Sequence, residues 1–261
     1  MRRLGDLLAG DRPAIGTWNQ IPAPEVIDLI GWSGFDFAVI DCEHGAFGLR
    51  EAEAQARACD AVNLAPVVRA PCADPVWIGR ALDAGIPHVL VPDVRDPGTL
   101  AACVARTRFA PRGTRGACPC VRSGRHVVRD WPDYARTQEV ETGILALIES
   151  VEGLNALDEL LNVGGVACWM LGPFDLAVSM GREGDWRHPE VGAALEDAAD
   201  QILKRGGILS IPVFAEDPEE CQALAERWIN QGARLILIGT DKIILGAGLR
   251  AGAKVLGRRQ R

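Results

Sequence analysis

The sequence predicts an α/β fold, a closed (β/α)8 TIM barrel, on three observations. The chain has 261 residues, close to the roughly 250 typical of one such barrel. Short runs rich in β-branched residues alternate with longer amphipathic stretches, a pattern of repeated βα units and a parallel sheet. Eight such runs occur. Eight strands with intervening helices favour a closed barrel over an open doubly wound sheet.

The predicted elements follow one another in regular order. The strands are expected at 15–19, 35–41, 65–69, 88–92, 144–149, 168–172, 208–212 and 234–239. The helices between them are expected at 24–33, 50–62, 75–84, 153–161, 190–205 and 217–231. Asp74 before Pro75 reads as an N-cap with proline in the first helical position, and Gly85 as the stop of the same helix. No GxGxxG follows the first strand, which weakens a dinucleotide-binding interpretation.

One segment, 108–133, interrupts the repeat and is rich in Arg, Gly, Pro and Cys. Loops of this length inside a compact domain tend to be functional. We expect it to close over the mouth of the barrel or to form a subunit contact. The chain has no internal repeat and no low-complexity linker, so 1–261 is predicted to form a single domain.

Composition narrows the class of partner. The net charge of -7 provides no basic field for nucleic acid or anionic lipid, so neither is expected as a partner. Asp6 and Asp11 interrupt any secretory apolar segment, and no apolar run is long enough to span a membrane, so a cytoplasmic protein is expected. The eight cysteines lack paired CxxC spacing and are expected to be mostly buried thiols.

Ionisable residues follow four of the predicted strands. In a barrel of this kind catalytic groups lie at the carboxyl ends of the strands. Asp41 and His44 follow the second strand, Arg69 ends the third, Glu149 ends the fifth and Asp175 follows the sixth. A single acid in such a place is more often a helix N-cap than a ligand. Their joint placement favours a functional site.

Glu149 and Asp175 are the candidate metal ligands. Two carboxylates from neighbouring strands form an oxygen-rich site suited to Mg²⁺ or Mn²⁺, which leave coordination positions for water or substrate oxygens. His88, His126 and His188 lie at other points of the pattern. A structural zinc site is therefore not expected.

Several short motifs occur along the chain in the same order as in one known family. They are 34–45 (GFDFAVIDCEHG), 66–69 (PVVR), 82–85 (LDAG), 111–116 (PRGTRG), 148–150 (IES) and 172–176 (GPFDL). Together they resemble the HpcH/HpaI aldolase family, metal-dependent class II pyruvate aldolases that include 4-hydroxy-2-oxoheptanedioate aldolase and 2-dehydro-3-deoxygalactarate aldolase. The resemblance covers nearly the whole chain. It implies a barrel of the phosphoenolpyruvate/pyruvate-binding type.

The resemblance implies a lyase that cleaves the C3–C4 bond of a 4-hydroxy-2-oxo acid, giving pyruvate and an aldehyde, with a place in aromatic or sugar acid catabolism. A divalent metal (Mg²⁺, Mn²⁺ or Co²⁺) absorbs the charge of the pyruvate enolate. The implied roles are metal ligands at Glu149 and Asp175, a holder of the keto-acid oxygen at Arg69, a general acid/base at His44 and supporting carboxylates at Asp41 and Asp83.

The substrate pocket is expected to include Trp18, Leu147, Gly172, Pro173 and Phe174. Two of these depart from the family pattern, in which Gln often replaces Leu147 and Ala often replaces Phe174. The sequence therefore does not assign the aldehyde part of the substrate, and these two changes disfavour a bulky dicarboxylate aldehyde partner. The family is commonly a hexamer, a trimer of dimers, whose last helices exchange between subunits. Here that helix would cover about 243–257.

Three alternatives remain. A lyase acting on a CoA thioester, as in citrate lyase, shares the carboxylate-bound metal, and the loop arginines 112, 115, 122 and 125 are its one candidate for the CoA phosphates. A Schiff-base aldolase needs a lysine, and the chain has only Lys204, Lys242 and Lys254. A barrel that binds a keto acid without catalysis is the non-enzymatic alternative.

Overall fold

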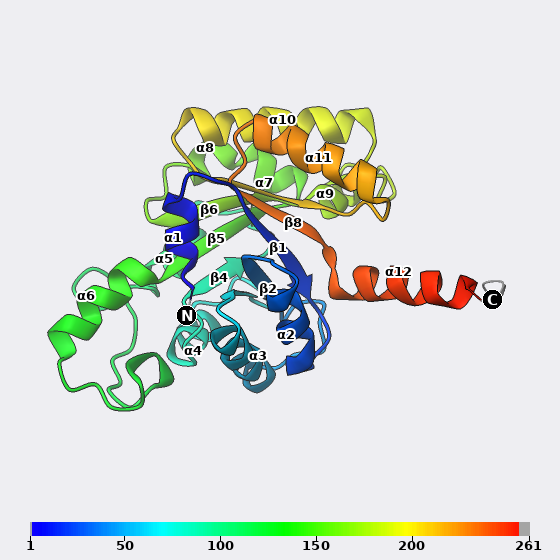
Figure 1. Ribbon diagram of the computed structural model, residues 1–261. Helices are drawn as coiled ribbons and strands as arrows, with labels where there is room; N and C mark the ends of the chain where they lie inside the picture. Colours follow the sequence, from blue (N-terminus) through cyan, green and yellow to red (C-terminus); the bar gives the residue numbers. More distant parts are fainter. Residues whose placement is uncertain (1, 256–261) are drawn as a thin grey trace.

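Eight parallel strands close into a barrel, as predicted (Figure 1). The computed structural model describes residues 2–255. Each strand pairs with the next along the chain, and β8 pairs with β1 to close the ring. The strands are β1 Ala14–Asn19, β2 Phe37–Asp41, β3 Ala65–Arg69, β4 His88–Val91, β5 Gly143–Ile148, β6 Val166–Leu171, β7 Leu209–Val213 and β8 Leu235–Thr240. All eight predicted strands are confirmed in order.

Helices surround this barrel, and short ones extend its loops. The first six are α1 Leu4–Ala9, α2 Pro24–Trp32, α3 Leu49–Ala61, α4 Pro75–Asp83, α5 Pro97–Ala105 and α6 Trp131–Glu141. The others are α7 Val151–Asn155, α8 Leu157–Leu160, α9 Pro173–Ser179, α10 Pro189–Lys204, α11 Pro218–Asn230 and α12 Asp241–Lys254, with a 3-10 turn η1 at Arg122–Gly124. The predicted start of α4 is confirmed, because Asp74 accepts a hydrogen bond from the Val76 N–H at 2.8 Å.

The core has two parts because the strands are buried on both faces, as their continuous apolar runs require. One cluster of apolar side chains fills the barrel. A larger cluster and a smaller one around Ile27 and Leu64 lie between the barrel and the helices. Phe37 is fully buried inside the barrel. A Cβ at Gly16 would lie 2.5 Å from its ring, so the glycine makes room for it. Leu4 and Leu7 of α1 join the same interior cluster.

The segment 108–133 does not close over the mouth, contrary to one of the two expectations for it. It follows α5, which returns from the carboxyl end of β4, and it precedes β5. The segment therefore lies at the opposite, amino-terminal end of the barrel. There Arg122 donates a 2.9 Å hydrogen bond to the carbonyl of Ala84, shortly before β4. Its other expected role, a subunit contact, stays a prediction.

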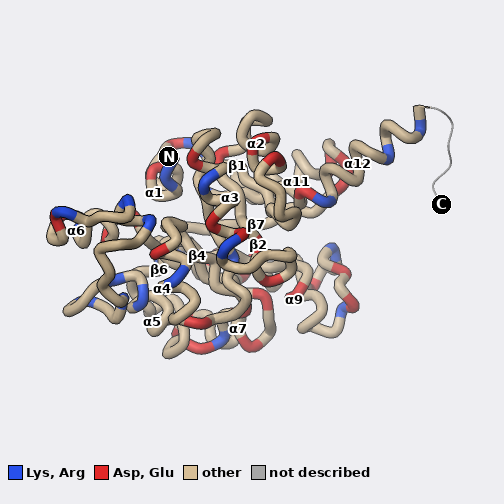
Figure 2. Tube along the Cα trace, turned by 90° about the horizontal axis from the view of Figure 1, so that it is seen from below, with Lys and Arg blue, Asp and Glu red and all other residues tan. Residues whose placement is uncertain are grey.

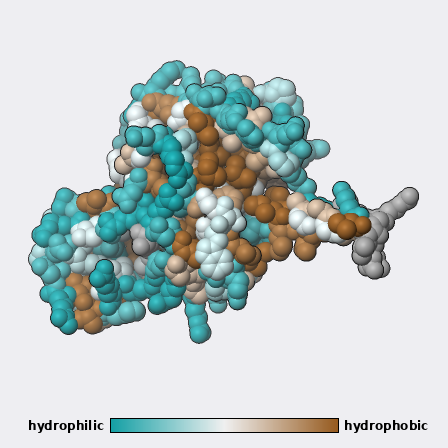
Figure 3. Space-filling model, in the orientation of Figure 1, coloured by the Kyte–Doolittle hydropathy of each residue, from teal (hydrophilic) through white to brown (hydrophobic). Residues whose placement is uncertain are grey.

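The helix α12 projects away from the barrel (Figure 1). Several of its apolar side chains are exposed, among them Ile244, Leu245 and Leu249, and Figure 3 shows apolar surface along the helix. This is the segment expected to exchange between subunits, and that exchange stays a prediction. The last two residues of the predicted helix 243–257 lie outside the described part of the chain.

The root of α12 is tied to the loop that leaves β1. The buried Asp241 carboxylate accepts hydrogen bonds from the Asn19 side chain at 2.9 Å and from the backbone N–H groups of Gln20 and Ile21 at 2.8 and 2.9 Å. Its other oxygen accepts from the Lys242 N–H at 2.7 Å. The Asp241 carboxylate thus connects the junction between β8 and α12 to the loop that follows β1.

The remaining surface is mixed in charge. Acidic and basic residues interleave along the chain (Figure 2). Among residues 2–255, no helix is both long enough and apolar enough to cross a membrane. All eight cysteines are free thiols and five are buried, which confirms the expectation of mostly buried thiols.

Candidate active site

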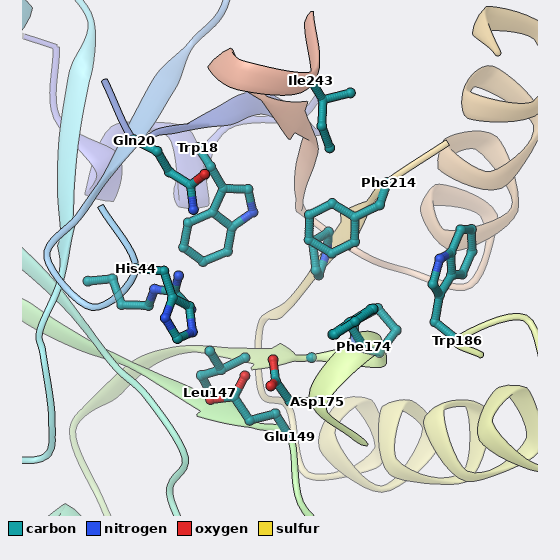
Figure 4. A pocket seen from close by; sticks show the side chains of 14 residues that line it. Trp18, Gln20, His44, Leu147, Glu149, Phe174, Asp175, Trp186, Phe214 and Ile243 are labelled. Atoms are coloured by element: carbon teal, nitrogen blue, oxygen red, sulfur yellow. The ribbon is translucent and has the colours of Figure 1, made fainter. Parts of the chain in front are cut away.

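A cavity with a volume of about 350 Å³ opens at the carboxyl ends of the strands. Nine of the expected site residues line it: Trp18, His44, Arg69, Leu147, Glu149, Gly172, Pro173, Phe174 and Asp175. Figure 4 shows Glu149, Asp175 and His44 toward one end of the cavity. Residues from distant parts of the chain thus meet where the fold predicts a site.

Arg69 is the fixed cation of this cavity. It ends β3 beside Asp41, its register partner on β2. Its Nε and Nη2 donate to the two oxygens of Asp41 at 2.8 and 2.5 Å, and its Nη1 lies 2.9 Å from Glu43. The guanidinium also lies over the Trp18 ring, 4.5 Å from its centre. A bidentate, stacked arginine of this kind is held in one orientation.

Burial alone would raise the pKa of Asp41, but the hydrogen bonds and charge of Arg69 hold it below its ordinary value. Asp41 is therefore ionised at neutral pH. Its Oδ1 also accepts the backbone N–H groups of Glu43 and His44, both at 3.1 Å. Asp41 thus anchors Arg69 and shapes the loop that carries His44.

Glu149 follows β5 and is only 7% exposed. Its Oε1 accepts a 2.9 Å hydrogen bond from the Asp93 N–H. Burial, followed by the nearby charge of Asp175, raises the pKa of Glu149 to about 8. A Cβ at Gly172 would lie 2.6 Å from the Glu149 Cβ. This glycine is therefore needed to leave room for Glu149.

Asp175 lies in the first turn of α9, which starts directly after β6. Figure 4 shows its carboxylate beside that of Glu149. A buried carboxylate whose pKa is raised by the charge of a neighbouring carboxylate marks a natural site for a cation. Within residues 2–255, no cluster of three or more His, Cys, Asp and Glu side chains suits a metal. Two carboxylates fit an ion such as Mg²⁺, which keeps waters or substrate oxygens in its other positions.

His44 reaches the cavity from the loop after β2, and its side chain is 60% exposed. Its Nε2 lies 3.9 Å from Glu43. Asp41 accepts a hydrogen bond from the backbone N–H of His44, and among the described residues the imidazole ring donates none to Asp41. The proposed support of the ring by Asp41 is therefore indirect, through the loop.

Asp83, expected to support the same histidine, lies elsewhere. It is the last residue of α4, and α4 runs back from the mouth, so Asp83 reaches the amino-terminal end of the barrel. There its carboxylate accepts a 3.1 Å hydrogen bond from Arg115, whose side chain is almost completely buried. The structure brings Asp83 together with the segment 108–133 and not with the cavity of this chain.

Other residues in or beside the cavity were not assigned a role from the sequence. Gln20 lines the cavity and donates a 2.8 Å hydrogen bond to Asp41, and Glu43, outside the cavity lining, contacts Arg69. The signal for both was their position just after a strand. Trp186, Phe214 and Ile243 add an apolar wall. Of these, Phe214 also follows a strand closely, whereas the loop that carries Trp186 has no such signal.

Comparison with known proteins agrees with this geometry. The model of the family described as HpcH/HpaI aldolase/citrate lyase matches residues 14–244. A pyruvate aldolase from Rhizobium etli is 35% identical over 244 residues, 94% of this chain and 93% of that protein. A 4-hydroxy-2-oxo-heptane-1,7-dioate aldolase from Klebsiella pneumoniae is 34% identical over 246 residues, 94% of this chain and 90% of that protein.

A solved structure is similar over nearly its whole length. A HpcH/HpaI aldolase/citrate lyase family protein from Burkholderia cenocepacia superposes with a TM-score of 0.88 at 31% sequence identity. The match covers 98% of this chain and 99% of that one. The similarity therefore includes every strand of the barrel and the loops at its mouth.

Proposed function

The chain belongs to the HpcH/HpaI aldolase/citrate lyase family, and from that premise we propose that its cavity cleaves, and in reverse forms, the C3–C4 bond of a 4-hydroxy-2-oxo acid. The protein is a class II aldolase, a carbon–carbon lyase, and its relatives' names point to pyruvate as one product. The observation that carries the proposal is the meeting of Glu149 and Asp175 with Arg69 and His44 in one cavity.

Glu149 and Asp175 would hold a divalent cation, Mg²⁺, Mn²⁺ or Co²⁺. When bound, such an ion supplies a positive charge that offsets the negative charge developing on pyruvate as the bond breaks. The family is generally dependent on a divalent metal. The two protein carboxylates leave the remaining coordination positions to the substrate and water.

Arg69 would orient the 2-oxo acid. Its guanidinium is already fixed by Asp41 and Glu43 and by stacking on Trp18, so little side-chain entropy is lost when substrate binds. The same cation would stabilise negative charge on the substrate oxygen, because its own charge is held in a fixed position in a largely apolar cavity. Asp41 acts through Arg69 and is a positioning residue.

His44 would transfer the proton. In cleavage, its imidazole accepts the proton of the 4-hydroxyl, the C4–O bond becomes the aldehyde carbonyl, and the electron pair of the C3–C4 bond moves to the pyruvate part as an enolate. Protonation of C3 then completes pyruvate. Imidazole suits this role because its unperturbed pKa lies near neutrality. A water molecule in the open cavity is the alternative base.

The other functions have less support. The loop arginines 112, 115, 122 and 125 lie in the segment at the amino-terminal end of the barrel, away from the cavity, so they offer no phosphate site there for a CoA ester. No lysine belongs to the cavity wall among the described residues, which disfavours a Schiff base. A purely binding role leaves the paired Glu149 and Asp175 without purpose.

The test is pyruvate release from 4-hydroxy-2-oxopentanoate, followed with lactate dehydrogenase and NADH. Protein stripped with chelator should be inactive and should recover with Mg²⁺, Mn²⁺ or Co²⁺. Glu149→Gln and Asp175→Asn should lose metal binding in calorimetry and lose activity, whereas the exposed control Glu159→Gln should keep both. Full activity in either ligand variant would refute the site.

Treatment with borohydride in the presence of pyruvate tests the Schiff-base alternative, since reduction converts a lysine–pyruvate imine into a stable covalent adduct on the protein. Tight binding of a CoA ester without aldol cleavage would favour the citrate lyase type. Binding of pyruvate without release from any 4-hydroxy-2-oxo acid would favour the non-enzymatic barrel.

We also infer that 1–261 forms one domain and that it assembles as a homo-oligomer through α12, as the family resemblance implies. The exposed apolar side chains of that helix support an intersubunit contact. Sedimentation velocity distinguishes a hexamer from smaller assemblies.

A further inference from the structure

The cavity is divided into a charged end and an apolar end. Arg69, Glu149, Asp175 and His44 gather at the first, where pyruvate is proposed to bind. The opposite wall consists of Phe174, Pro212, Phe214, Trp186 and Ile243. Figure 4 shows the rings of Phe174, Phe214 and Trp186 on the side away from His44.

The apolar end is built by several elements and is not a chance surface patch. Phe174 belongs to α9, Phe214 follows β7 and Ile243 lies in the first turn of α12. Gly184, at a φ of +79°, lies against the Phe174 ring, because a Cβ there would approach the ring to 3.0 Å. This contact holds the loop that carries Trp186 close to Phe174.

This wall lacks a cation for a second carboxylate. Among the described residues that line the cavity, Arg69 is the only arginine or lysine, and it is assigned to the 2-oxo acid group at the charged end. The nearby Arg187 stacks on the Trp186 ring, 3.9 Å from its centre, and pairs with Glu220 at 2.7 Å. An anionic group bound against the wall would lose hydration without gaining a partner.

One neutral polar group does face this space. Trp18 is 4% exposed, and its indole Nε1 has no hydrogen-bond partner. Figure 4 shows that nitrogen on the side of the indole toward Ile243 and Phe214. A buried indole N–H without a partner is costly. It is suited to donate to an uncharged oxygen of a bound molecule.

We propose that the aldehyde partner of this enzyme is uncharged and apolar, aromatic or a branched or linear alkyl aldehyde, and that Phe174, Trp186 and Phe214 select it. This inference rests on the proposed aldolase function. In the addition direction, C3 of the pyruvate enolate bonds to the aldehyde carbon, and the carbonyl electron pair takes up a proton as the new hydroxyl. The aldehyde's substituent then lies along the apolar wall.

The test uses matched pairs of aldehydes that differ in charge and little in size. They are pentanal with 4-oxobutanoate and benzaldehyde with 4-formylbenzoate, each added to pyruvate with Mg²⁺ and the intact protein. The neutral member should have a kcat/KM at least about tenfold higher, since an apolar pocket discriminates by factors of this order and an unpaired buried charge adds to them. Equal rates, or preference for the anion, would overturn the proposal.

Deuterium exchange into the pyruvate methyl group, followed by NMR without any aldehyde, separates the two levels of inference. Absence of exchange means that the proposed function has failed. Exchange combined with preference for the anionic aldehydes means that only the present inference has failed. The exchange rate also serves as the reference for each variant.

A charge-adding variant makes the same point from the protein side. Phe214→Arg should shift the ratio of the two aromatic aldehydes toward 4-formylbenzoate by at least about tenfold, because it supplies the missing cation. Val140→Arg adds the same charge on an exposed position of α6 and should leave the ratio unchanged. If Phe214→Arg does not fold, Phe174→Arg replaces it, since that side chain is already half exposed. An unchanged ratio in a folded variant contradicts the assignment of the wall.

Discussion

The buried histidine at the start of β4 should make the fold sensitive to mild acid. His88 is 4% exposed, its Nδ1 has no hydrogen-bond partner, and burial lowers its pKa to about 4. In the unfolded chain a histidine titrates near 6.5. Between these two values the unfolded state binds more protons than the folded state. The free energy of unfolding therefore rises with pH across this window and falls as pH drops from 6.5 toward 4.

The size of the effect follows from the width of the window. One pKa unit corresponds to about 1.4 kcal/mol. The contribution of neutral His88 should thus be complete at pH 7, reduced by about 1 kcal/mol at pH 5.5 and by about 2 to 3 kcal/mol at pH 4.5. Protonation of buried carboxylates such as Asp41 also lowers the free energy of unfolding in acid. Measurements on the wild type alone therefore do not isolate the contribution of His88.

The variant His88→Gln isolates it, because glutamine stays neutral at every pH. Urea unfolding of both proteins at pH 7, 5.5 and 4.5, at one protein concentration, gives the stability difference at each pH. Wild type should lose stability relative to the variant by the amounts above. The exposed His126→Gln serves as control and should show a constant difference. A pH-independent difference for His88→Gln would refute the reasoning.

Three further predictions concern the cavity. Gly172→Ala should weaken Mn²⁺ binding at least about tenfold in calorimetry, since the new Cβ displaces Glu149; unchanged affinity would show that the carboxylate has room to move. Asp41→Asn should lower the free energy of unfolding by about 3 kcal/mol and raise the KM for pyruvate, because it removes a charge from the buried Arg69 pair; a stability within about 0.5 kcal/mol of wild type counts against this pair. Removal of metal with EDTA should abolish pyruvate release, and Mg²⁺ should restore it in wild type and not in Asp175→Asn; activity that survives EDTA points away from a metal.

The barrel was predictable because its strands are buried on both faces. Runs such as 144–149 and 234–239 are almost wholly apolar, which is typical of parallel strands under helices. The segment 108–133 was harder, since an Arg- and Gly-rich stretch gives no signal of the end of the barrel at which it lies. That follows from the direction of the helix before it, which the structure supplies.

The site was predictable where a residue directly ends a strand, as Arg69 and Glu149 do. The rule that strand ends meet at one mouth is enough to group such residues. The strand-end rule gives no expectation for Asp83, whose expected role came only from the family resemblance; as the last residue of α4 it lies at the opposite end of the barrel. The aromatic wall shows a limit of the rule, since Trp186 and Phe214 come together only through the packing of distant loops.

The hydrogen bonds of Asp241 give α12 a mechanical link to the chemistry. The first residue of the projecting helix, Asp241, is hydrogen-bonded to the loop that follows β1. The Gln20 side chain of the same loop donates a hydrogen bond to Asp41. A partner that binds α12 would therefore act on a short series of contacts, from Asp241 to Gln20, from Gln20 to Asp41 and from Asp41 to Arg69. We therefore expect a change in the orientation of α12 to shift the loop that carries Gln20 and, through Asp41, to affect how Arg69 is held.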